Sequence, residues 1–262
     1  MNPELLLRWE GAALWAVMIG SFLLLGAWEG TQPRRALTQA TGRRWGIHGL
    51  LLLCASLLNT LLMRTSPLLV AAASDSHGLL RPLPWLLQFA IAILLLDLVH
   101  YLSHRLFHWI GPLWRIHEVH HSDPDYDVST AARFHPFEVG LGTALYLGAV
   151  ALLGPPVSAV FFAELLTQLL NVFVHANVVV PAPVERLLRY AFITPDLHRI
   201  HHSLVLEDQN RNFGQTFLWW DRLFGTYLPR SASGEMAPAT GTGATKPDSL
   251  PALLVQPFRL RR

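Results

Sequence analysis

The chain has 262 residues, of which 52% are hydrophobic and only 15% are charged, and its formal net charge is +2. This composition excludes an ordinary soluble globule and indicates an integral membrane protein, so we expect membrane lipid among its partners and no nucleic acid. The single cysteine, Cys54, excludes a disulfide framework and a CxxC metal site.

Four apolar regions predict the membrane portion. Residues 11–28 carry no charge and are long enough to cross a bilayer, and residues 45–63 are interrupted only by His48. Residues 84–96 continue into DLVHYLSHRLFH, and residues 139–174 are broken by the sequence GPP at 154–156. Because glycine and proline end helices, this last region predicts a helical hairpin that returns to the side of the membrane it left.

The placement of arginines predicts the orientation. The loop between the first two spans carries Arg34, Arg35, Arg43 and Arg44, and positive charge in short loops marks the cytoplasmic side. Three crossings then return the chain to the cytoplasm near His104, and the hairpin returns it there again. We expect an inner-membrane protein with all its dense histidine clusters on the cytoplasmic face.

The fold class that follows is all-α. We predict an integral membrane bundle of about four spanning or hairpin helices. The expected divisions are an N-terminal transmembrane region over 1–83, a main domain over 84–229, and a flexible C-terminal tail over 230–262. The tail is predicted from its many Ala, Gly, Ser, Thr and Pro residues between 231 and 249 and from its basic end, FRLRR.

Histidines recur at helical spacing. The stretch RIHEVHHSDPDYD contains an HxxHH pattern, and HRIHHS repeats that pattern later in the chain. Residues three and four apart lie on adjacent parts of one helical surface, as the three histidines of each trio do, and the pair in HRLFH can bind one metal ion. Two more histidines flank the hairpin. The candidate metal ligands are therefore His104, His108, His117, His120, His121, His135, His175, His198, His201 and His202.

Ten imidazoles are too many for one zinc ion, which takes three or four protein ligands. Two metals sharing the set is the economical interpretation, although imidazole suits Fe, Zn, Cu and Ni alike. His48 stands alone in an apolar span, so we expect it to be a hydrogen-bonded structural residue.

Four residues are expected to support the ligands. Asp97 and Tyr101 share a helical stripe with the HRLFH pair, and an intramembrane carboxylate needs a partner. We expect Asp97 to accept a hydrogen bond from a ligating histidine and so fix its tautomer. His100 lies deeper in the apolar run and is assigned a supporting or packing role, and Asn212, in DQNRNFG, is also placed around the ligands.

Two other interpretations use the same residues. His117, Glu118 and His121 fit the HExxH pattern of a zinc protease, in which the glutamate is the general base, and this predicts an intramembrane zinc hydrolase. The repeat has Arg199 in place of that glutamate, so what recurs is HxxHH. A third possibility is a metal-storing or haem-binding protein, but haem needs few histidines and these are crowded on one side.

Six separated stretches, namely DLVHYLSHRLFH, HEVHHSDPDYDVSTAARFHPFE, NVFVHAN, HRIHHS, DQNRNFG and WWDRLFGTY, together resemble the fatty acid hydroxylase superfamily, also called the sterol desaturase family. The likeness runs from about Pro84 to Pro229. It implies a cytosolic helical cap, set on the membrane helices, that holds a histidine-rich dimetal site. Some members have a further histidine where this chain has Asn171, which leaves His135 as the expected tenth ligand.

That resemblance implies two iron ions, with zinc able to occupy the sites in recombinant preparations, and an O₂-dependent oxidation of a C–H bond in a sterol, fatty acyl chain or related lipid. Hydroxylation and desaturation differ by small shifts of the carbon chain, so both stay open. The chain has no cytochrome, flavin or iron–sulfur motif. We therefore expect a separate electron-transfer protein of ferredoxin, rubredoxin or cytochrome type.

Overall fold

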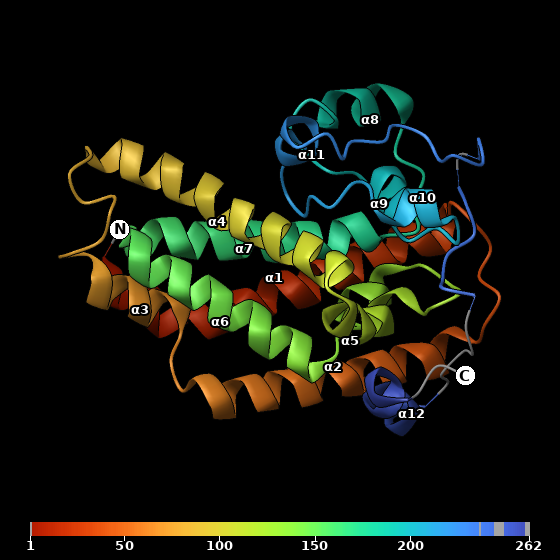
Figure 1. Cartoon of the computed structure of the whole chain (residues 1–262), viewed down its shortest axis with the longest axis horizontal. Coiled ribbons are helices and arrows are strands. Elements are labelled where there is room, and N and C mark those ends of the chain that lie inside the picture. The colour runs from red at the N-terminus through yellow and green to blue at the C-terminus, as the bar shows by residue number, and fades with distance from the viewer. Residues whose placement is uncertain (1, 236, 244–248, 260–262) are drawn as a thin grey trace.

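The computed structural model describes residues 2–235, 237–243 and 249–259. Its framework consists of long helices that run side by side, with both ends of the hairpin and most short helices gathered at one end (Figure 1). Five stretches are long and apolar enough to cross a membrane. They comprise α1 (Pro3–Thr31), α2 (Thr41–Met63) with its short continuation α3 (Pro67–Ser74), α4 (Trp85–Trp109), α6 (Pro136–Leu153) and α7 (Val157–His175).

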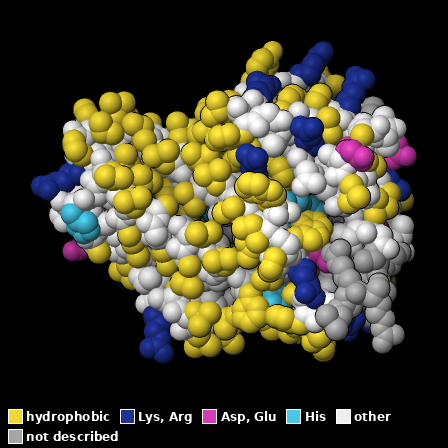
Figure 2. Space-filling view, viewed as in Figure 1, with side chains coloured by type: hydrophobic (Ala, Val, Ile, Leu, Met, Phe, Trp, Pro, Cys, Tyr) yellow, Lys and Arg dark blue, Asp and Glu magenta, His cyan; other side chains and the backbone are white. Residues whose placement is uncertain are grey.

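The outer surface of this bundle is apolar. Large side chains such as Leu24, Leu57 and Leu86 are 76%, 62% and 69% exposed, and apolar atoms cover most of the bundle in the view of Figure 2. Exposed leucines in such numbers are unfavourable in water and favourable against lipid tails. The all-α membrane fold predicted from composition is therefore confirmed.

The predicted hairpin is also confirmed. Gly154 ends α6 in the left-handed conformation, with φ of 55°, and Pro156 caps the start of α7. The backbone of Gly78 packs directly against this turn, because a Cβ added at Gly78 would lie 2.2 Å from the Cα of Gly154. Only glycine permits both the positive φ and this close approach. The hairpin thereby places His135, at the start of α6, and His175, at the end of α7, at the same end of the bundle.

A cap of short helices covers that end. Its members are α5 (Gly111–His121), η1 (Val128–Ala132), α8 (Ala182–Leu188), α9 (Pro195–His201), α10 (Leu206–Gln209) and α11 (Trp219–Leu223). Buried ion pairs tie the cap to α2, because Arg44 contacts Asp123 at 2.9 Å and Asp127 at 2.6 Å. His48 is fully buried beside them, with Nδ1 2.9 Å from the hydroxyl of Ser129, which confirms that it is a hydrogen-bonded structural residue.

The C-terminal segment lies against the body wherever the structure describes it. Ser231 contacts Asp208, and Leu253, in α12 (Leu250–Val255), is fully buried with Leu51 and Val119. A final turn, η2 (Gln256–Phe258), follows. The apolar residues of LPALLV explain this packing, although composition alone assigns them to a flexible tail. Flexibility of the segment stays a prediction, and residues 236, 244–248 and 260–262, including most of FRLRR, lie outside the described residues.

Candidate metal centre

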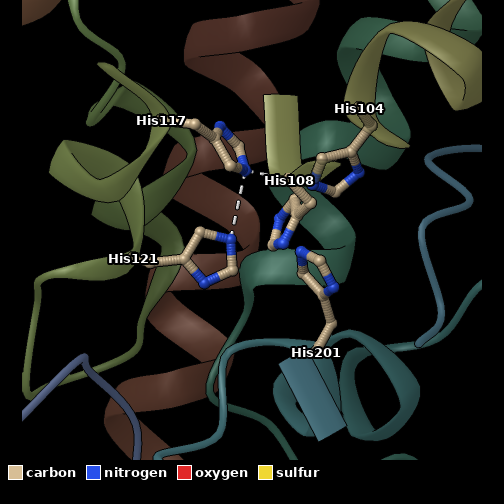
Figure 3. A group of neighbouring side chains, drawn as sticks. All are labelled: His104, His108, His117, His121 and His201. Carbon is tan, nitrogen blue, oxygen red and sulfur yellow. Dashed lines mark hydrogen bonds between the residues drawn. The ribbon is translucent and has the colours of Figure 1, made fainter. Parts of the chain in front are cut away.

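Nine of the ten candidate histidines form two compact groups. Within each group the ligand nitrogens all lie within 4.8 Å of one another. The first group, called site A, is made of His104, His108, His117, His121 and His201, and the second group, called site B, is made of His120, His175, His198 and His202. Figure 3 shows the five rings of site A, which come from α4, α5 and α9, turned toward a common centre.

Each HxxHH motif contributes to both sites. His117 and His121 belong to site A while His120 belongs to site B. In the second motif the two sites are exchanged: His198 and His202 belong to site B, and His201 belongs to site A. The two sites are in direct contact, because the rings of His121 and His202 are stacked with centroids 4.2 Å apart.

The spacing of the nitrogens fits bound cations. In site A the Nε2 atom of His117 is 3.1 Å from the Nε2 atoms of both His104 and His121. In site B the Nε2 atom of His175 lies 3.2 Å from that of His120 and 3.1 Å from that of His198. A metal–nitrogen bond of about 2.1 Å places two ligands at right angles about 3.0 Å apart, so a metal ion between them gives these separations.

Unpartnered atoms support the same conclusion. Nε2 of His108, His201 and His202 is buried and has no hydrogen-bond partner among the described residues. Buried polar nitrogens are costly unless something satisfies them, and a metal ion accepts their lone pairs. The histidine groups are therefore consistent with a dimetal site.

Backbone carbonyls fix the tautomers of several rings. Nδ1 of His104 donates to the carbonyl of Phe213 at 2.8 Å, and Nδ1 of His201 donates to that of Arg211 at 2.8 Å. His175 makes the equivalent bond to Asn171 at 2.6 Å. With Nδ1 protonated, Nε2 presents its lone pair toward the site, as metal-binding histidines require.

Asn212 lies between the two carbonyls that orient His104 and His201. Its φ of 53° turns the backbone so that the carbonyls on both sides of it reach these rings. Its side chain donates to the carbonyl of Leu197, on α9, and exchanges hydrogen bonds with Leu228. The supporting role of Asn212 stays a prediction, and the contacts that would carry it run through the backbone of residues 211–213.

Tyr101 is linked to the loop of residues 211–213 through a chain of hydrogen bonds. Its hydroxyl is 2.8 Å from that of Thr226, which donates to Asp221. Asp221 in turn accepts the N–H of Phe213 at 2.8 Å. This buried chain of hydrogen bonds holds in place the residue whose carbonyl orients His104.

The expected role of Asp97 requires correction. Its Oδ2 accepts hydrogen bonds from the N–H of Phe217 at 3.2 Å and from the indole of Trp220 at 2.9 Å, so its recorded partners belong to the segment before and within α11 and not to a histidine. Helical spacing places Asp97 on the stripe of His104 and His108, but it lies two turns further into the bundle, where the α11 segment packs on α4. Asp97 anchors the cap to α4.

The carboxylate that does orient a candidate ligand is Glu138, which the motif reasoning missed. Nδ1 of His117 is 2.6 Å from its Oε1, and both side chains are buried. The sequence did contain a signal, because Glu138 lies in RFHPFE, in the first turn of an apolar helix. An acid at the start of a membrane helix needs a partner.

Replacing Glu138 by glutamine is expected to weaken metal binding at site A by about 10- to 100-fold, the usual cost of losing a carboxylate behind a ligating histidine. Glutamine is nearly the same size but carries no charge to favour the Nδ1–H tautomer of His117. Titration of the apoprotein with Fe²⁺ under nitrogen would measure this, with Glu207→Gln, on the exposed surface of α10, as control. Unchanged affinity at both sites would show that Glu138 does not support the ligand.

His100 and His135 lie outside both groups. His100 stacks on Tyr146 with ring centroids 5.0 Å apart, one turn below His104, in keeping with its supporting or packing role. His135 accepts the backbone N–H of Phe137 at 3.2 Å as the N-cap of α6, and its Nε2 is 3.3 Å from the carbonyl of Leu254. The geometry thus gives His135 a capping role and places it in neither site.

Burial favours the neutral form of five histidines in the cap. Desolvation, followed by the proximity of other imidazoles, lowers the pKa of His120, His121, His198 and His202 well below 6.5. For His201 burial lowers the pKa to about 3. At neutral pH these rings are unprotonated, which is the state that binds a metal.

A cavity of about 280 Å³ opens beside the two sites. Candidate ligands from both sites line it, including His104 and His117 from site A and His120 and His175 from site B. Its other walls come from α4, α6 and α7, with apolar residues such as Phe107 and Val174 among them. A bound molecule there would touch both sites at once.

The fold and site define an all-helical membrane protein with a buried, histidine-rich dimetal site. A family model described as fatty acid hydroxylase matches residues 89–226, just over half of the chain, and includes all nine grouped histidines. The chain belongs to the fatty acid hydroxylase family. The expected membership is confirmed.

Curated relatives extend the comparison. The chain is 33% identical over 178 residues to an ornithine lipid hydroxylase of Rhizobium tropici, which covers 67% of this chain and 51% of that protein. It is 34% identical to an alkylglycerol monooxygenase of Danio rerio, over 57% of this chain and 33% of that protein. It is 32% identical to the alkylglycerol monooxygenase of Homo sapiens, over 55% of this chain and 31% of that protein. The matched part of the chain therefore spans between about a third and about half of the length of these relatives. No solved structure was found to match it.

Proposed function

We propose that the chain is a membrane-bound di-iron oxygenase that uses O₂ to hydroxylate a C–H bond of a lipid. The observation that carries the proposal is the pair of adjacent histidine sites opening onto one cavity inside the membrane bundle. Two irons bound there would supply the activation of O₂ that an unactivated C–H bond demands. The nine histidines are proposed as their ligands.

Iron is favoured over zinc by the number of donors. Site A offers five imidazoles, whereas structural zinc is almost always bound by four ligands and catalytic zinc by three and a water. Imidazole-rich sites with more than four donors suit iron, which accepts higher coordination numbers. The residues of the chain fix the tautomers of several of these rings and bury most of them away from water.

A lipid substrate follows from the position of the cavity. Much of its wall is formed by the membrane helices α4, α6 and α7, which supports entry of a lipid from the bilayer without crossing water. Hydroxylation is proposed over desaturation because the relatives are named a hydroxylase and monooxygenases. The lipid classes in those names, ornithine lipid and alkylglycerol, support a substrate with a polar headgroup.

The zinc hydrolase interpretation fits the geometry less well. His117 and His121 do share a site, as HExxH requires, but three further histidines join them there. A hydrolytic zinc site keeps a position open for water beside three protein ligands. Five converging imidazoles leave little room for that chemistry.

The decisive experiment combines metal analysis with ¹⁸O₂ labelling. The full chain, purified in lipid nanodiscs with iron and supplied with a chemical reductant, is expected to contain about two irons and to add one ¹⁸O atom to a lipid of the host membrane. Zinc-loaded protein serves as the control and should add none. Label entering only from H₂¹⁸O, with one zinc per chain, would favour the hydrolase instead.

We propose that the electrons come from a separate ferredoxin, rubredoxin or cytochrome-type protein. Hydroxylation by O₂ consumes two electrons and two protons and releases water, and the single cysteine cannot hold a four-thiolate cluster. The cap is the exposed end nearest to the sites and is the proposed docking face (Figure 1).

We also propose that the cap faces the cytoplasm of a cell with the protein in its inner membrane. In support, Arg34 of the arginine-rich first loop pairs with Asp196 on α9 at 3.0 Å, so that loop and the cap share one end of the bundle. Reporter fusions after Arg44 and after Asp123 should both report the cytoplasm, while one near Ser76 should report the opposite side. Opposite signals from the first two would contradict this topology.

A further inference from the structure

A second cavity, of about 430 Å³, lies within the membrane bundle beyond the metal cavity. We call it the polar chamber, because its walls carry hydrogen-bonding side chains from four helices. They include Glu10 on α1, Asn59 on α2, Tyr146 on α6, and Glu164, Thr167 and Gln168 on α7. Polar groups at this depth are costly and tend to be functional, and neither group of metal-site histidines contacts these side chains. One of them, Glu10, also accepts the backbone N–H of Leu68 at the start of α3, at 3.5 Å.

The polar chamber adjoins the metal cavity. His100, Gly142 and Thr143 line both cavities. Gly142 leaves the junction open, because a Cβ added there would have no neighbouring atom within 4 Å. A single elongated molecule can therefore occupy both cavities.

The polar chamber contains a pair of acids and no nearby positive side chain to offset them. Glu10, only 8% exposed, and Glu164 are hydrogen-bonded to each other through their side chains. Two carboxyl groups in such contact hold at least one proton between them, so the pair carries at most one negative charge. The residues lining the chamber include no Lys or Arg, and a buried charge is retained only where a partner of opposite sign is present.

The unpartnered atoms specify the kind of partner. Oε2 of Glu164 and Oδ1 of Asn59 are buried acceptors without a hydrogen-bond donor among the described residues. The hydroxyl of Tyr146, a residue only 5% exposed, is also unpartnered. A protonated primary amine supplies one positive charge and three N–H donors, which matches both the charge and these acceptors.

We infer that the polar chamber binds the ammonium group of an amine-bearing lipid, whose chain passes His100 and Gly142 to reach the metal cavity. This inference rests on the proposed function for the part of the lipid that reacts, and it names the substrate class. The acid pair and Tyr146 set which lipid is held, and the length between the two cavities sets which carbon is presented.

The test measures binding without turnover. Native mass spectrometry of the full, iron-loaded chain would follow titration with hexadecylamine and with N-acetylhexadecylamine, which has the same chain but no charge. Wild-type protein is expected to retain one hexadecylamine at least about tenfold more tightly than the amide, as for one buried charge interaction. Equal retention of amine and amide would overturn the inference, with water then left as the occupant.

Variants locate the site. Glu164→Gln and the double variant Glu10→Gln with Glu164→Gln should lose this tenfold preference, whereas Glu207→Gln removes one acid from the exposed cap and should keep it. Retention of the preference in a folded double variant, judged by two bound irons, would place the amine elsewhere and overturn the inference. The comparison of amine with amide on wild-type protein decides the matter even if the double variant does not fold.

The two proposals fail separately. Selective amine binding without ¹⁸O incorporation into any lipid leaves the polar chamber standing and removes the proposed oxygenase function. Incorporation of ¹⁸O into lipids without selective amine binding does the reverse.

Discussion

His201→Ala and His202→Ala are each expected to lower the iron content from about two to about one per chain and to reduce turnover at least about 100-fold. The two residues are neighbours in sequence, but their rings belong to site A and site B respectively. Residues that act as one unit give non-additive losses, so the double variant should be little less active than either single variant. Iron analysis and ¹⁸O₂ turnover measure both effects.

His135→Ala is the control that separates ligands from other buried histidines. Because the His135 ring caps α6 and lies in neither site, the variant should retain two irons and most of its activity, at a stability cost of about 1 kcal/mol for the lost cap. Loss of one iron in His135→Ala would make it the tenth ligand after all. Two irons retained in His201→Ala would refute the ligand set instead.

Gly142→Leu is expected to reduce turnover at least about tenfold while leaving both irons in place. The new side chain would project into open space at the junction of the metal cavity and the polar chamber, where it would displace the substrate from its reactive position. Leucine also favours helix over glycine by roughly 0.8 kcal/mol, so α6 should not be weakened.

Gly148→Leu is the matched control for that variant. It makes the same change six residues further along α6, at an exposed glycine that also has open space around it and lines neither cavity. It should behave as wild type. Full activity in Gly142→Leu would show that the substrate does not pass this junction, and loss of iron in it would show that the substitution disturbs the sites themselves.

Much of this architecture could be predicted from the sequence because it depends on local properties. The length and apolarity of the spans require helices in a membrane, and the GPP break makes a hairpin of the fourth region whatever it packs against. The hairpin in turn determines that His135 and His175 lie at one end. The number and spacing of the histidines are likewise local properties, and they indicate two metals.

The spacing even contains the division of each motif between sites. Residues four apart on a helix differ in direction by about 40° and residues three apart by about 60° to the other side. His117 and His121 accordingly share site A, and His198 and His202 share site B. In both motifs the histidine three residues after the first, His120 or His201, joins the other site. Spacing does not say which site each pair joins, because that depends on how α5 and α9 face each other.

What surrounds the ligands was decided by tertiary structure alone. Glu138 contacts His117, which lies 21 residues earlier in the chain. The carbonyls of Arg211 and Phe213 orient His201 and His104. No sequence pattern predicts these contacts. Asp97 shows the converse, since its helical stripe points to the histidines but its partners come from the α11 segment. A side chain's direction along its own helix follows from local geometry, whereas its hydrogen-bond partner depends on which distant segment packs there and brings an unsatisfied group within about 3 Å.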